Sequence, residues 1–182
     1  FQASCDEFQG EPLWFDIHRR MSNRGVFRDC FSFEDLDAER QPVPKLGVDA
    51  WAPSNAHLLI HGAMHRVAHG RGTHATRLNW LYDLALLFEA MDSAERQSFV
   101  HEALERRMGA VCAHALETCE AGFGMDFPAD VRDELMGQAA REPAAKLLNA
   151  GRVSWALSDL MQQRGLGGKI RFAGELLSNR LR

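Results

Sequence analysis

The stretch SNAHLLIHGAMHRVAHG, residues 54–70, carries a histidine at every fourth position: His57, His61, His65 and His69. Residues four apart lie one above another on nearly the same face of an α-helix. The stretch therefore predicts a helix over about residues 55–69, with a ridge of imidazoles along one side. Imidazole binds metals and exchanges protons near neutral pH. This histidine ridge is either a functional site or a polar seam packed against acidic groups.

Composition limits the class of protein. The chain has 182 residues, 46% of them hydrophobic and 25% charged, which suits one domain, or one domain plus a fragment of another, with a buried core. A formal net charge of −4 argues against broad binding of nucleic acid or anionic membranes. No apolar run approaches the roughly 20 residues of a membrane span, and no signal peptide is visible. The cysteines form no CxxC pair, and we expect reduced packing thiols in a cytoplasmic protein: Cys5, Cys30, Cys112 and Cys119.

The predicted fold class is α+β, predominantly α. Residues 1–8 and 13–18 form a short antiparallel hairpin around a Gly-Glu-Pro turn, and residues 22–50 are mostly irregular because two prolines disfavour helix there. From residue 51 to residue 182, apolar periodicity predicts a helical bundle. It has about six helices, at approximately 55–69, 76–91, 93–122, 128–140, 143–160 and 169–181.

Within the histidine ridge, His61 and His65 are a pair that could chelate one metal ion. No glutamate follows either of the first two histidines, so the zinc-protease pattern HExxH is not met. Spacing of four also drifts by roughly 40° per step, so the four rings cannot all face one ion. The alternative is a semi-buried face of histidines hydrogen-bonded to neighbours, with Asp83 of the next helix as an acceptor. Contact with nucleotide phosphates is a third interpretation.

Asp16 is the second candidate, because it lies within an apolar predicted strand. Alternation places it on one face with Trp14 and His18. A carboxylate there must be paired, hydrogen-bonded or bound to a cation. Mg²⁺ prefers such oxygen ligands. Pairing with Arg19 or Arg20 is the structural alternative.

Three segments of the sequence occur in the same order as similar segments of a known family. LWFDIHRRM (13–21) holds the aspartate and histidine, VPKLGVDAWAPSNAHLLIHGAMHRVAH (43–69) leads into the ridge, and RLNWLYDLALL (77–87) forms the next helix. Together they resemble the uncharacterised nucleotidyltransferase family, which is related to the polymerase-beta-like nucleotidyltransferase superfamily. The resemblance covers about residues 10–90; the later helices fit only in general character.

The resemblance implies Mg²⁺ held by three carboxylates, two from a D-x-D pair on an early strand and one from a later strand. The ions would orient an NTP whose α-phosphate is attacked by an acceptor. Asp16 matches the third carboxylate and His18 the histidine after it, while the helices would shape the acceptor pocket. Upstream of Asp16 there is no D-x-D, and the acidic residues are Asp6, Glu7 and Glu11.

This departure leads us to expect an incomplete or inactive portion of an enzyme. Residues 1–50 would be a remnant of a nucleotidyltransferase-like sheet that begins in mid-segment, and residues 51–182 the helical bundle. The chain alone would show no transfer activity. Two alternatives from other classes stay open. One is a noncatalytic helical module that binds a partner or ligand, and the other is a metal-binding protein that uses the histidine ridge.

Overall fold

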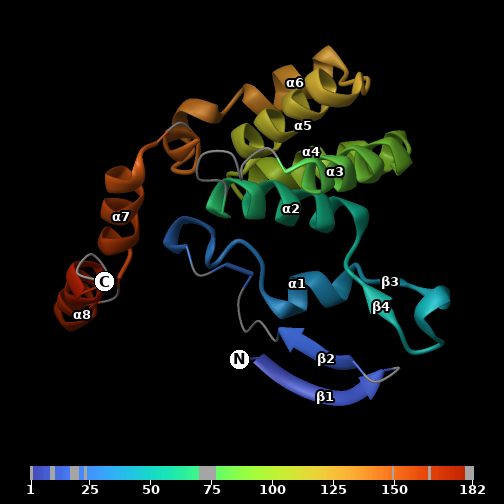
Figure 1. Cartoon of the computed structure of the whole chain (residues 1–182). Coiled ribbons are helices and arrows are strands. Elements are labelled where there is room, and N and C mark those ends of the chain that lie inside the picture. The colour runs from blue at the N-terminus through green and yellow to red at the C-terminus, as the bar shows by residue number, and fades with distance from the viewer. Residues whose placement is uncertain are drawn as a thin grey trace.

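The computed structural model describes residues 2–8, 11–16, 21–22, 24–69, 77–148, 150–163 and 165–178 (Figure 1). For the first two strands the description covers the backbone and its pairing. No described helix is long and apolar enough to cross a lipid bilayer.

The described residues form eight α-helices and two small antiparallel sheets, which confirms the predicted fold class. The strands are β1 Gln2–Phe8, β2 Glu11–Asp16, β3 Gln41–Pro42 and β4 Trp51–Ala52. The helices are α1 Phe33–Ala38, α2 Asn55–His69, α3 Leu78–Ala90, α4 Ser93–Glu105, α5 Gly109–Phe123, α6 Ala129–Met136, α7 Arg152–Met161 and α8 Gly165–Ser178. Short 3₁₀ turns are η1 Gly25–Phe27, η2 Pro44–Leu46, η4 Ala139–Arg141 and η5 Ala145–Leu147.

The N-terminal hairpin pairs β1 with β2, as predicted. Its register places Asp16 opposite Gln2 at one end and Glu11 opposite Phe8 at the other. The register shifts between Cys5 and Glu7, which is the mark of a β-bulge.

Helix α2 is the centre of the bundle, because α3, α4 and α5 all pack against it. Its apolar residues recur at helical spacing, and Leu59, Ile60 and Met64 are almost fully buried. Burial of each such side chain contributes about 1.5–3 kcal/mol. The helix that carries the histidine ridge is therefore also the main core element, and its bounds match the prediction.

The predicted helix over 93–122 is two helices, α4 and α5. The break falls at Arg107, whose φ of 59° is left-handed, and the Met108 amide donates back to the Ala103 carbonyl at 2.7 Å. Helix α5 then starts at Gly109. The buried Glu142 accepts from the Gly109 and Ala110 amides at 3.0 and 2.8 Å, and so caps the new helix. The capping partner is more than 30 residues away in sequence, so local pattern did not indicate the break.

Two other segments differ from expectation. The connection predicted as irregular contains α1, which begins with a capping box between Ser32 and Asp35. The fifth predicted helix, over 143–160, divides into the 3₁₀ turn η5 and the helix α7. Because the third predicted helix is α4 and α5, the described residues after residue 51 form seven α-helices and not six.

Helices α7 and α8 lie to one side of the bundle (Figure 1), and α7 packs against η1. Asp159 joins them: its carboxylate accepts from Arg24 Nη1 at 2.7 Å and from the Gly25 amide at 3.1 Å. The Trp155 ring lies 6.0 Å from the Phe27 ring, centroid to centroid. A segment near the start of the chain thus holds the C-terminal helices.

Candidate functional site

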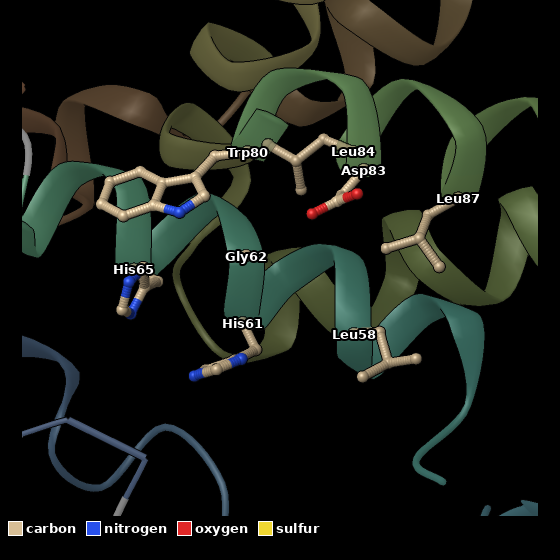
Figure 2. Close-up of a pocket in the computed structure, with 8 residues that line it drawn as sticks. All are labelled: Leu58, His61, Gly62, His65, Trp80, Asp83, Leu84 and Leu87. Atoms are coloured by element: carbon tan, nitrogen blue, oxygen red, sulfur yellow. The ribbon is translucent and has the colours of Figure 1, made fainter. Parts of the chain in front are cut away.

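A pocket of about 280 Å³ lies between α2 and α3 (Figure 2). Each helix presents four residues at i, i+3, i+4 and i+7, the spacing of one helical face. Helix α2 contributes Leu58, His61, Gly62 and His65, and α3 contributes Trp80, Asp83, Leu84 and Leu87. The pocket is therefore the direct product of two facing helical stripes.

Gly62 sets how closely the two helices approach. A Cβ atom built at this position would lie 2.7 Å from Leu84 Cδ2, which is closer than real Cβ contacts. Leu84 itself is only 2% exposed. Because residue 62 has no side chain, Leu84 can approach the α2 backbone. The Leu84 side chain then forms the apolar floor of the pocket.

Aromatic and charged groups line the rest of the pocket. The His65 ring meets the Trp80 indole edge to face, with centroids 4.8 Å apart, and the Arg77 guanidinium lies 5.1 Å above the same indole. The exposed Asp83 carboxylate points between the helices (Figure 2). Such a pocket offers a flat apolar wall, two imidazoles and one carboxylate, a combination that can hold a small ligand with polar edges.

The expected hydrogen bonds from the histidine helix to Asp83 are absent among the described residues. Asp83 and the histidines share the pocket instead, and the carboxylate stays exposed to solvent. Sequence reasoning placed Asp83 beside the ridge correctly because the two helices are adjacent. The sequence analysis did not identify Trp80 as a pocket wall. The i, i+3, i+7 spacing of Trp80, Asp83 and Leu87 already indicated that the three share one helical face.

The histidine ridge divides into two parts, as the drift per step predicted. His61, His65 and His69 follow one another, with ring centroids 6.0 and 4.4 Å apart for successive pairs. His57 is only 2% exposed and faces Glu39 and Glu102 instead. Of the side chains that the structure describes, no group of three potential metal ligands includes His61 or His65.

Asp16 is the last residue of β2, and His18 lies outside the described residues. The register puts Asp6 and Glu7 three to four residues along the hairpin from Asp16. At 3.3 Å per residue that is a backbone separation of about 10–13 Å along the hairpin. The backbone register places Gln2, and not an acidic residue, directly opposite Asp16.

A family model described as uncharacterised nucleotidyltransferase matches residues 5–124, a span that includes both Asp16 and the pocket between α2 and α3. No curated protein and no solved structure matches the chain.

Proposed function

Because the chain belongs to the uncharacterised nucleotidyltransferase family, we propose that it serves the transfer of a nucleotidyl group from an NTP to an acceptor. The observation that carries this proposal is the extent of the family match. The matched span, residues 5–124, includes the strand of Asp16 and the two helices that form the pocket. The two regions are thus parts of one family unit.

In this proposal Asp16 is one oxygen ligand of Mg²⁺, with His18 close by in sequence. A bound Mg²⁺ would neutralise charge on the nucleotide phosphates. The direct cross-strand partner of Asp16 is Gln2, which is not acidic, so in this proposal further ligands of the ion come from other positions of the protein. We therefore expect nucleotide binding by this chain to be much easier to detect than turnover.

The pocket between α2 and α3 is proposed to receive the acceptor. Its volume of about 280 Å³ fits a small molecule and not a polynucleotide. The Asp83 carboxylate can accept hydrogen bonds from a hydroxyl or amino group, and the Trp80 indole can cover the apolar face of a ring. A small acceptor with an apolar face and hydroxyl or amino groups is the chemical class that these walls suit.

Calorimetric titration with each of the four NTPs, with Mg²⁺ and with EDTA, tests the nucleotide part. We expect Mg²⁺-dependent binding that weakens by at least about tenfold, or about 1.4 kcal/mol, in Asp16→Asn. Glu11→Gln is the matched control, because Glu11 begins the same strand at the opposite end of the hairpin. Absence of binding for all four nucleotides, or equal weakening in both variants, contradicts the proposal.

Titration with small hydroxylated or amino compounds, in the presence and absence of NTP and Mg²⁺, decides between the transferase and a noncatalytic ligand-binding module. A small hydroxylated or amino ligand that bound the pocket, was lost in Asp83→Asn and was indifferent to nucleotide and Mg²⁺ would support the module. Binding that strengthened when NTP and Mg²⁺ were present would support the transferase, because the two substrates then meet on one protein.

A further inference from the structure

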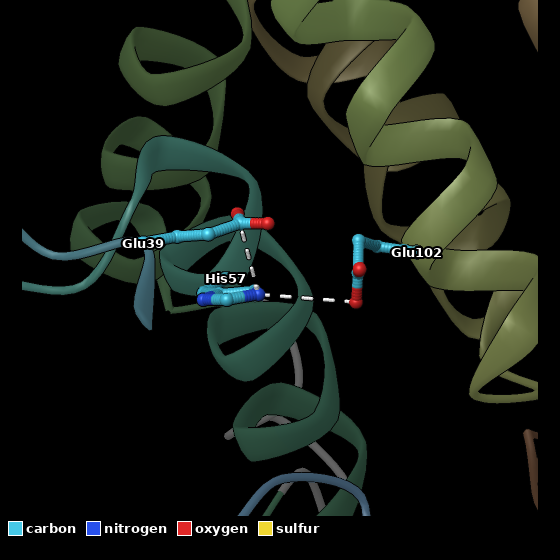
Figure 3. A group of neighbouring side chains, drawn as sticks. All are labelled: Glu39, His57 and Glu102. Carbon is cyan, nitrogen blue, oxygen red and sulfur yellow. Dashed lines mark ion pairs between the residues drawn. The ribbon is translucent and has the colours of Figure 1, made fainter. Parts of the chain in front are cut away.

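A second cluster of polar side chains lies at the first turn of α2 and shares no residue with the pocket. His57 of α2 faces Glu39, which follows α1, and Glu102 of α4 (Figure 3). His57 Nε2 lies 3.7 Å from Glu39 Oε2 and 3.8 Å from Glu102 Oε2. One ligand atom from each of the three residues falls within 4.8 Å of the other two. Three separate segments of the chain therefore converge on one point.

His57 lacks a hydrogen-bond partner for either ring nitrogen within the described part of the chain, although it is only 2% exposed. An imidazole always has at least one N–H donor, and an unsatisfied buried polar group costs about 1–3 kcal/mol. The ring is fixed in place because Phe31 packs edge to face against it, with centroids 4.8 Å apart. The orphaned Nε2 atom is directed at the two carboxylates.

The separations suit a metal better than a hydrogen bond. At 3.7 and 3.8 Å, the nitrogen–oxygen distances exceed hydrogen-bond length. Two ligands each about 2.0–2.1 Å from a tetrahedral Zn²⁺ are roughly 3.3 Å apart. The two nitrogen–oxygen distances exceed that spacing by a few tenths of an ångström, and all three ligand atoms lie within 4.8 Å of one another.

The surrounding charges also favour a dication. Glu39, Glu102 and Asp35 are acidic, while Arg106 is the cation that contacts two of them, through bonds of 2.7 Å to Glu102 and 3.2 Å to Asp35. When His57 is neutral, the three carboxylates and the one guanidinium together carry a formal charge of −2. Arg106 also donates to the Cys30 carbonyl at 2.7 Å, so it is held in place, and its Nε–H bonds the same Glu102 oxygen, Oε2, that faces His57. Outer hydrogen bonds of this kind are a regular feature of metal sites.

We propose that His57, Glu39 and Glu102 form a binding site for a divalent transition metal of the Zn²⁺ class. One imidazole nitrogen and two carboxylate oxygens are ligands that Zn²⁺ accepts, with a fourth position open to water. The ion would link the end of α1, the first turn of α2 and α4. The site shares no residue with the pocket or with Asp16, so it is independent of the proposed transfer function.

Zinc titration of protein stripped with EDTA tests the site, with calorimetry for affinity and thermal unfolding for stabilisation. We expect one saturable site and a rise in the melting temperature. Glu39→Gln should weaken binding at least about tenfold, because loss of outer partners alone costs 10–100-fold. The Glu39 side chain is 46% exposed, so this variant keeps the fold. His57→Gln should abolish the site.

The matched control is the double variant His61→Gln, His65→Gln, which changes the next two histidines of the same helix. It should bind zinc as the original chain does. Co²⁺ substitution supplies a second readout, because nitrogen and oxygen ligands give no thiolate charge-transfer band, whereas cysteine ligation would. Absence of saturable binding overturns the proposal. So does a thiolate band, or binding that survives Glu39→Gln but is lost in the double control.

Discussion

The three described cysteines show how a single residue type responds to burial. Cys30, Cys112 and Cys119 are free and buried, as the sequence analysis predicted for packing thiols. Burial raises the pKa of Cys30 to about 12 and that of Cys119 to about 11, against an ordinary value of 9.0. Burial also raises the pKa of Cys112. The Cys119 thiol donates to the Leu81 carbonyl at 3.2 Å, which further fixes it as a neutral group.

These shifts predict that the free energy of unfolding falls at alkaline pH. In the unfolded chain the thiols ionise as the pH rises above 9.0. In the folded chain the Cys119 thiol stays protonated until the pH passes its raised pKa of about 11. The unfolded state then binds fewer protons, so stability declines as the pH rises through that window. Urea unfolding at about pH 8 and about pH 10.5 measures the decline. In Cys119→Ala the decline should be smaller, and an equal decline would contradict the assignment.

At the scale of the element, the pocket depends on the close approach of α2 and α3 at Gly62. Gly62→Ala would gain about 1 kcal/mol of helix propensity. It would also force Leu84 out of a packed position, which typically costs about 1–3 kcal/mol. Because Leu84 is buried, we expect overpacking to win, with a net loss of stability up to about 2 kcal/mol and a smaller pocket.

Gly174→Ala is the control for this prediction. Gly174 lies within α8, and nothing lies within 4 Å of a Cβ atom built there. Propensity then acts alone and should stabilise the protein by up to about 1 kcal/mol. Urea unfolding compares the two variants. If Gly62→Ala stabilised the chain as much as Gly174→Ala, the contact with Leu84 would not limit the helix spacing.

Elements with strong local signals were predicted well from the sequence. Helix α2 has the expected bounds because Pro53 and Ser54 precede it and its apolar period is regular. Helix α4 begins where expected because Asp92 and Glu95 form a capping box. The break at Arg107 was missed because its partner, Glu142, is distant in sequence. The same limit applies to sites. His61, His65 and Asp83 were recognisable by type and spacing, whereas the convergence of Glu39 and Glu102 on His57 depends on tertiary packing.

At the scale of the whole molecule, Asp159 fastens the C-terminal helices to η1. Its side chain is 8% exposed and that of Arg24 is 24% exposed, so the ion pair is shielded from water on one side. Asp159→Asn removes the charge and leaves the guanidinium without its carboxylate. Loss of a hydrogen bond to a charged group costs about 1.5–3 kcal/mol.

We expect that cost to act locally. Hydrogen exchange should quicken in α7 by roughly 10–100-fold, while the amides of α2 and α5 keep their protection. Asp133→Asn on the exposed face of α6 is the control, and it should change neither region. Uniform acceleration over the whole chain would show instead that α7 unfolds together with the bundle.

The bond between Arg24 and Asp159 spans 135 positions of the chain. A ribosome that adds about 5–20 residues per second needs roughly 7–27 s to deliver the second partner after the first. Throughout that interval the Phe27 ring has no Trp155 to cover it. Until Trp155 has been synthesised, the nascent polypeptide therefore carries an uncovered aromatic surface at Phe27, to which a chaperone would bind.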